Sequence, residues 1–145
     1  MFHSILCPVD FDDNSMAALD LACKAAVENN APLALVHVVP MPVDAPEIGA
    51  LPSESVPLWQ DEAKAKLDEI TRKRIPGSVP STAMIRIGRP PEAIVAAAGE
   101  LKADLIVMAT HGRSRSAIGH FFLGSVAEQV VRESPCPVLV VPPRA

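Results

Sequence analysis

The sequence predicts an α/β protein with an open, five-stranded, mostly parallel sheet and helices on both faces. Five short apolar runs alternate with four longer segments of helical periodicity, which is typical of parallel strands joined by right-handed crossovers. Hydrophobic residues make up 49% of the chain, yet it contains only four Phe, one Trp and no Tyr. A core of small and branched residues suits buried parallel strands. The length of 145 residues predicts one domain spanning residues 1–145.

The first three elements follow from apolar runs and a capping signal. Residues 5–9 form a short apolar run that predicts a buried strand. The polar residues 12–15 are N-cap candidates for a helix whose Ala and Leu residues recur at helical spacing as far as about Asn29. Residues 33–39 predict a second buried strand. Residues 40–57 then hold five of the fifteen prolines, which predicts a long surface loop because proline removes a backbone donor.

The second half continues the alternation. Residues 58–75 predict an amphipathic helix with Ala63, Leu67 and Ile70 facing inward, and residues 83–87 predict a strand near a sheet edge because polar residues alternate in it. A helix starts at Pro90 or Pro91, where proline is tolerated, and ends near Leu101. The remaining elements are a strand at residues 104–108, a helix with one apolar face (Val126, Ala127, Val130 and Val131), and a strand at residues 138–141.

Charge, cysteine content and hydropathy exclude several classes of protein. The formal net charge of −4 argues against a broad surface for nucleic acid or anionic membranes. Cys7, Cys23 and Cys136 form no CxxC pair and lie among apolar neighbours, so we expect buried, reduced thiols. No apolar run approaches the length that spans a bilayer. We therefore expect a soluble, cytoplasmic protein with no nucleic-acid or membrane partner.

The carboxyl ends of the strands are the expected ligand site, because open parallel sheets bind ligands there. Asp10 follows the first strand, where its carboxylate can accept hydrogen bonds from a ribose hydroxyl or a base amine. It can instead cap the first helix, a role that the neighbouring aspartates could also fill. His37 lies inside an apolar strand and is interpreted as a core or partly exposed histidine rather than a ligand.

Residues 103–126 contain the strongest signal for a binding site. The apolar strand gives way to small and polar residues at 109–112, a basic loop with Arg113 and Arg115 follows, and Gly124-Ser125 then begins a helix. Free backbone N–H groups and the positive end of the helix dipole would meet at this point, which favours a phosphate site. The alternative is that Gly112 and Gly124 are ordinary turn and cap glycines.

Neither catalysis nor metal binding is predicted. The residue after Gly124-Ser125 is Val126, so no lysine completes a Walker A loop, and no GxGxxG follows the first strand. Ser125 has no evident general base and no GxSxG elbow. The four histidines are scattered singly, which is unlike a metal site.

Several segments together resemble the universal stress protein family. They are ILCPVDF near the start, LVHVV in the second strand, IGRPPEAIV before the third helix, and then DLIVMATHGRS, LGSVAEQVV and PCPVLVV. The resemblance implies a Rossmann-like, five-stranded parallel α/β fold. It also implies one of two kinds of function, since the family includes members that bind ATP and members that bind no nucleotide.

In the ATP-binding members the loop follows the pattern G-x-x-G-x9-G-[ST]. Gly112 matches the second glycine, and Gly124-Ser125 matches the last pair. Ala109 stands in place of the first glycine, and eleven residues rather than nine separate Gly112 from Gly124. Arg113 and Arg115 lie in the longer loop, where they could add phosphate contacts.

The resemblance implies where a nucleotide would lie. Asp10 and Val38 would hold the adenine and ribose end, and the start of the last helix would hold the phosphates. The full set of expected binding residues is Pro8, Val9, Asp10, Val38, Met108, Ala109, His111, Gly112, Arg113, Arg115, Gly124, Ser125 and Val126. The expected ligand is ATP or another adenine nucleotide, with or without Mg²⁺.

Three functional hypotheses follow. The first is a stress-response regulatory protein that binds adenine nucleotide without strong catalytic activity and forms a homodimer through the last strand, from Pro137 to Val141. The second is a nucleotide-free stress protein that acts through protein partners, as the altered loop spacing suggests. The third is a slow ATP hydrolase, for which the sequence offers no general base and only Asp10 as an evident carboxylate near the site.

Overall fold

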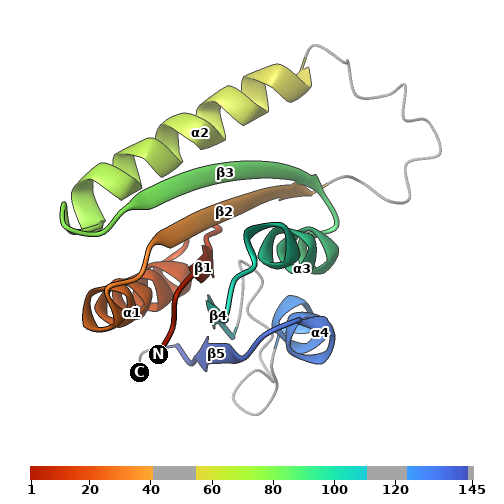
Figure 1. Cartoon of the computed structure of the whole chain (residues 1–145). Coiled ribbons are helices and arrows are strands. Elements are labelled where there is room, and N and C mark those ends of the chain that lie inside the picture. Colours follow the sequence, from red (N-terminus) through yellow and green to blue (C-terminus); the bar gives the residue numbers. More distant parts are fainter. Residues whose placement is uncertain (41–54, 111–123, 144–145) are drawn as a thin grey trace.

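The computed structural model describes residues 1–40, 55–110 and 124–143 of the chain (Figure 1). Helices and strands alternate through these residues, as the sequence predicts. The elements are β1 (Ile5–Pro8), α1 (Asp13–Asn29), β2 (Leu33–Pro40), α2 (Ser55–Arg74), β3 (Ser81–Gly88), α3 (Pro90–Leu101), β4 (Leu105–Ala109), α4 (Ser125–Glu133) and β5 (Val138–Val141).

The five strands form one parallel sheet in the order β3-β2-β1-β4-β5. The central strand is β1, in which Ile5 is in register with Leu33 of β2 on one side and with Leu105 of β4 on the other. Two strands form the edges: β3, as the alternating pattern predicts, and β5. The fold class predicted from the sequence is confirmed.

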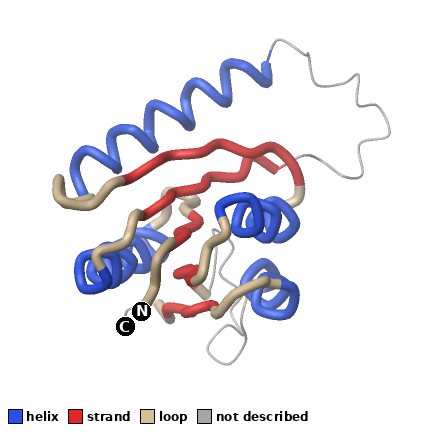
Figure 2. The backbone as a smooth tube through the Cα atoms, viewed as in Figure 1, coloured by secondary structure: helices blue, strands red, loops and turns tan. Residues whose placement is uncertain are grey.

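Helices cover both faces of the sheet, as the tube view shows (Figure 2). On one face, the odd-numbered residues of the central strands pack with α1 and α2, and this cluster includes the fully buried Leu19 and Leu67. On the other face, residues such as Leu6 and Ile106 pack with Ala97 of α3 and Val130 of α4. The period-two alternation of a strand divides the core into these two layers.

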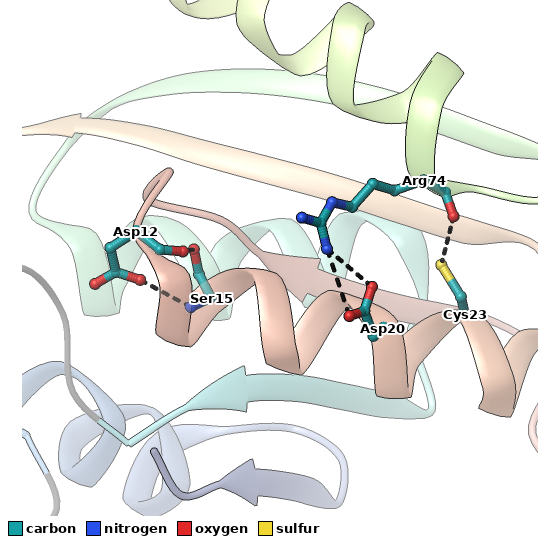
Figure 3. A network of polar contacts seen from close by, with 5 residues as sticks. All are labelled: Asp12, Ser15, Asp20, Cys23 and Arg74. Atoms are coloured by element: carbon teal, nitrogen blue, oxygen red, sulfur yellow. Dashed lines mark hydrogen bonds and ion pairs between the residues drawn. The ribbon is translucent and has the colours of Figure 1, made fainter. Parts of the chain in front are cut away.

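A side-chain cap marks the start of α1, and polar contacts connect α1 to the end of α2. Asp12 is the N-cap, and its side chain accepts a hydrogen bond from the backbone N–H of Ser15 at 2.8 Å. At the other end of the layer, the Arg74 guanidinium lies 3.2 Å from the Asp20 carboxylate, and the Cys23 thiol lies 3.8 Å from the carbonyl oxygen of Arg74 (Figure 3). These contacts link the end of α2 to the middle of α1.

Several predicted boundaries differ from the structure. The predicted loop over residues 40–57 is too long at both ends, because Pro40 pairs with Gly88 at the end of the β2–β3 ladder and α2 begins at Ser55. A proline near the start of a helix lacks only an N–H that has no intrahelical partner, so Pro57 does not delay α2. Residues 41–54 lie outside the described part of the chain. The strand β3 is also longer than the predicted residues 83–87.

The inward faces of the helices were predicted with one error. Ala63 and Leu67 are buried and Ile70 is partly buried, as expected for α2. In α4, Ala127 and Val130 are buried, but Val131, which the sequence places on the same apolar face, is 45% exposed.

The cysteines are free thiols, as predicted. Cys7 and Cys23 are buried, whereas Cys136 is only partly buried. Burial, and to a smaller extent the proximity of Cys23, raises the pKa of the Cys7 thiol far above its ordinary value. None of the described helices is both long enough and apolar enough to cross a membrane.

Candidate functional site

The strand order places the topological switch point of the sheet between the carboxyl ends of β1 and β4, and this position is called the crevice from here on. From β1 the chain runs through α1 to β2 and β3 on one side, and it then returns through α3 to β4 on the opposite side of β1. The direction of winding therefore reverses between β1 and β4, and ligands of open α/β sheets bind at such a reversal. Asp10 follows β1 and Thr110 follows β4, so both residues lie at this end of the sheet.

Asp10 provides a partly buried carboxylate on the β1 side. Its backbone N–H donates to the Ser15 hydroxyl at 3.3 Å, and its Oδ1 accepts from the backbone N–H of Asp12 at 3.3 Å. Because Asp12 is the N-cap of α1, Asp10 does not have the capping role that the sequence left open. Burial, followed by its contact with the Asp12 carboxyl, raises the pKa of Asp10 above its ordinary value. A smaller, opposing contribution comes from the Ser15 hydroxyl, which lowers the pKa of Asp10.

Phe11 and His37 form a stacked pair beside Asp10, on the face of the sheet that α1 and α2 cover. Their ring centroids are 4.4 Å apart, and the Lys66 Nζ of α2 lies 5.4 Å from the Phe11 centroid. The His37 Nδ1 is 2.7 Å from the carbonyl oxygen of Val9, which confirms the partly exposed, hydrogen-bonded histidine predicted for β2. Phe11 adopts a φ of 70°, a conformation that non-glycine residues rarely adopt and that no sequence signal predicted.

The junction between β4 and α4 forms the other side of the crevice. The backbone N–H of Thr110 donates to the carbonyl oxygen of Val141 at 3.1 Å, and the N–H of Gly124 donates to the carbonyl oxygen of Thr110 at 2.7 Å. Gly124 is the N-cap of α4 and supplies no side-chain cap. Among the described residues, no acceptor is found for the N–H groups of the first turn, at residues 125–127. Free amides and the positive end of the helix dipole therefore coincide here.

The predicted binding residues fall into two groups, those that the structure describes and those that it does not. The described ones lie at the carboxyl ends of β1, β2 and β4 or at the start of α4, namely Pro8, Val9, Asp10, Val38, Met108, Ala109, Gly124, Ser125 and Val126. Two of these have side chains committed to the core, since Val9 is 3% and Met108 is 4% exposed. His111, Gly112, Arg113 and Arg115 lie outside the described residues.

Sequence reasoning missed Thr110. Its side-chain oxygen is buried and has no hydrogen-bond partner among the described residues. A polar residue directly after a buried strand was the available signal, but it was interpreted only as part of the break that ends β4. No group of three metal-ligating side chains was found in the described residues.

The sheet order and the crevice define a doubly wound α/β protein with a carboxylate and a helix N-terminus at its switch point. Comparison with known proteins identifies the family. The chain belongs to the universal stress protein family, whose family model matches residues 1–142.

Relatives of similar length support this assignment. A universal stress protein of Thermus aquaticus is 37% identical over 97% of this chain and 99% of its own length. The solved structure of protein MJ0577 from Methanocaldococcus jannaschii has a TM-score of 0.85 and is 28% identical, with 99% of this chain and 98% of that chain covered.

Two further structures of the family contain nucleotides. A universal stress protein in complex with cAMP has a TM-score of 0.62 and 28% identity, with 97% of this chain and 96% of that chain covered. The universal stress protein of Archaeoglobus fulgidus in complex with dAMP has a TM-score of 0.66 and 25% identity, with 97% and 98% covered. Members of this fold therefore bind adenine nucleotides.

Proposed function

We propose that residues 1–145 act as one universal stress protein domain that binds an adenine nucleotide, ATP, ADP or AMP, in the crevice between β1 and β4. The nucleotide would serve a cytoplasmic, stress-response regulatory role rather than a fast reaction. The cAMP and dAMP complexes of related structures support adenine as the base.

The hydrogen bond between Gly124 and Thr110 carries the proposal. At 2.7 Å it joins the start of α4 directly to the end of β4. The amides at the start of α4 therefore have a defined place beside the crevice, whatever the length of the segment between these two residues. This contact supports binding although the segment between the two residues is two residues longer than in the pattern of ATP-binding members.

The opposite end of the nucleotide would lie at Asp10 and Val38. Asp10 is partly buried, and a carboxylate has two oxygens with several acceptor sites, so it can accept a further hydrogen bond from a ribose hydroxyl or a base amine. Val38 is partly buried near the end of β2 and offers an apolar contact for the base. Ser125 is exposed, and its hydroxyl can add a donor to the phosphate site.

A regulatory role fits the chemistry of the described residues better than catalysis does. Among the described residues, the carboxylates near the end of β1 are Asp10 and the neighbouring N-cap Asp12, and burial followed by the contact with Asp12 raises the pKa of Asp10. Mg²⁺ would then be held chiefly by the phosphates, as is usual where few carboxylates are present. Hydrolysis, if it occurs, would be slow.

Assembly as a homodimer through β5 is part of the proposal. The strand β5 is an edge of the sheet, and Leu139 on it is 42% exposed. An apolar edge strand offers unpaired backbone groups and hydrophobic side chains to a second copy.

Two measurements test the nucleotide proposal. Mass spectrometry of small molecules released from the purified, denatured protein should detect an adenine nucleotide. Titration calorimetry of the nucleotide-free protein should then give measurable heats with ATP and AMP at millimolar concentration or below. No released nucleotide and no heat with either ligand would contradict the proposal and favour the alternative function, a nucleotide-free stress protein that acts through protein partners. Phosphate release with Mg²⁺ tests hydrolysis separately.

A further inference from the structure

Thr110 is a partly buried residue at the end of β4 whose side-chain oxygen is buried and has no hydrogen-bond partner among the described residues. Both backbone polar groups of Thr110 are occupied, the N–H by Val141 and the carbonyl by Gly124. Its Oγ1 is buried, yet no described residue lies within hydrogen-bond distance. A buried hydroxyl without a partner costs free energy relative to a methyl group of the same size. A buried and unpaired hydroxyl therefore calls for an explanation beyond the stability of the fold.

The position of Thr110 is well defined, because two hydrogen bonds hold its backbone. The bond to Val141 continues the β4–β5 ladder beyond the last paired residues, Ala109 and Val141. By the two-residue alternation of a strand, Thr110 lies on the same face as Ile106 and Met108, whose side chains belong to the cluster under α3 and α4. The hydroxyl is thus on the α4 side of the sheet, and the carbonyl oxygen of the same residue accepts from the backbone N–H of the N-cap Gly124.

We propose that the Thr110 hydroxyl is a positioning group for the ligand and donates a hydrogen bond to a phosphate oxygen bound at the start of α4. This inference rests on the proposed function and adds a residue to its site. A hydroxyl can donate to an anionic oxygen while the α4 amides donate to others, and hydrogen bonds to charged groups are the stronger kind. The ligand thereby supplies the partner that the empty protein lacks.

Removing the hydroxyl should raise the stability of the nucleotide-free protein and weaken its binding of nucleotide, and one substitution tests both effects. Thr110→Val keeps the shape of the side chain and removes the hydroxyl. In the nucleotide-free protein it removes an unpaired buried group, so the thermal midpoint should rise by a few degrees. With AMP, the same variant should bind about 10-fold or more weakly, because a hydrogen bond to a charged oxygen is lost. With adenosine, which has no phosphate, the affinity should stay within about twofold of wild type.

Two controls separate the hydroxyl from other effects. Thr110→Ser keeps the hydroxyl and should keep the affinity for AMP close to that of wild type, although it loses a methyl group and some stability. Thr82→Val makes the same substitution at an exposed position of the edge strand β3 and should change neither the affinity nor the midpoint.

Each contrary outcome has a distinct meaning. A Thr110→Val variant that is destabilised without nucleotide shows that the hydroxyl is paired in the empty protein, and this overturns the inference. Unchanged AMP affinity, or an equal loss for adenosine and AMP, also overturns it while the proposed function stands. If wild type binds neither ATP nor AMP, the proposed function fails and the inference fails with it.

Discussion

The backbone N–H of Gly124 donates to the carbonyl oxygen of Thr110 at 2.7 Å, which brings residues 14 positions apart in the sequence into direct contact. The start of α4 is thereby attached to the end of β4 by the backbone alone. In an α/β protein, this attachment determines where the free amides of the helix lie.

Gly124→Asp should abolish binding of adenine nucleotide and leave the fold intact. Gly124 has a φ of −60° and a ψ of 156°, which any residue can adopt, and Asp is a favourable N-cap. The thermal midpoint should therefore be unchanged or slightly higher. A carboxylate at this position repels a phosphate and adds bulk beside it. Calorimetry with ATP at millimolar concentration measures the loss.

Gly124→Asn is the matched control for that variant, because it adds similar bulk and no charge. It should bind ATP more weakly than wild type and more tightly than Gly124→Asp. Full ATP affinity in Gly124→Asp would place the phosphates away from α4.

Ser125→Ala should cost only about 0.5–1.5 kcal/mol of binding free energy, the value of one neutral hydrogen bond. The same calorimetry with ATP measures this difference.

Asp10→Asn should stabilise the nucleotide-free protein at pH 7 and weaken nucleotide binding. The pKa of Asp10 is raised in the folded protein, chiefly by burial, so the fold favours the protonated carboxyl. The stabilisation by the protonated carboxyl is complete below the ordinary pKa of 3.8. It is lost as the pH rises through the pKa that Asp10 has in the folded protein. At pH 7 the variant should gain less than about 1 kcal/mol, given the partial exposure of the group.

Denaturant unfolding from pH 3 to pH 7 measures this effect, and the gain from Asp10→Asn should disappear toward the acidic end. Asp13→Asn is the control, since Asp13 is an exposed carboxylate in the first turn of α1. That variant should show no such pH-dependent gain. A loss of stability in Asp10→Asn at pH 7 would mean that the ionised carboxylate stabilises the fold.

Leu139→Lys should shift the protein from dimer to monomer. Leu139 is 42% exposed on the edge strand β5, and a charge at an apolar edge opposes pairing with a second copy. Val140→Lys is a less specific test, because Val140 also packs against the buried cluster beneath α4. Sedimentation velocity measures the change. Val27→Lys, at a valine 53% exposed on α1, is the control, and an unchanged dimer in Leu139→Lys would place the interface elsewhere.

Asp104→Asn should lower stability at neutral pH, with the difference disappearing at low pH. The Asp104 carboxylate accepts hydrogen bonds from the backbone N–H groups of His3 at 2.7 Å and Ser4 at 2.9 Å. Partial burial raises its pKa, but these donors bring the net value below the ordinary 3.8. The contribution is therefore present above pH 3.8 and is lost as the pH falls through the folded pKa.

The expected loss for Asp104→Asn is under about 1 kcal/mol, because an amide oxygen still accepts one of the two bonds. Chemical denaturation at pH 7 and at pH 3 measures it. Glu92→Gln, which neutralises an exposed carboxylate in the first turn of α3, provides a control at a helix end. An equal loss for Asp104→Asn at both pH values would show that packing rather than charge is responsible.

Much of the candidate site was accessible from the sequence because its signals are local. Asp10 follows an apolar run, and Gly124-Ser125 precedes a helical pattern, so both could be placed at element ends. Thr110 could not be identified as a candidate from the sequence. Its hydroxyl is of interest because it has no hydrogen-bond partner among the described residues, and that depends on the positions of all its neighbours. The contact between the Phe11 and His37 rings joins the segment between β1 and α1 to β2 and likewise has no local signature.

The sequence by itself determined the order of helices and strands, the parallel α/β class and the family, because apolar periodicity, proline and glycine act over a few neighbouring residues. Only the tertiary structure decided that β1 lies between β2 and β4, that Asp12 rather than Asp10 caps α1, and that Val131 is exposed. The strand order and the exposure of Val131 depend on which distant segments pack together, and the choice of Asp12 depends on the backbone geometry at the start of α1, where several adjacent polar residues could serve as the cap. Burial and hydrogen-bond pairing are properties of that packing, so no local pattern records them.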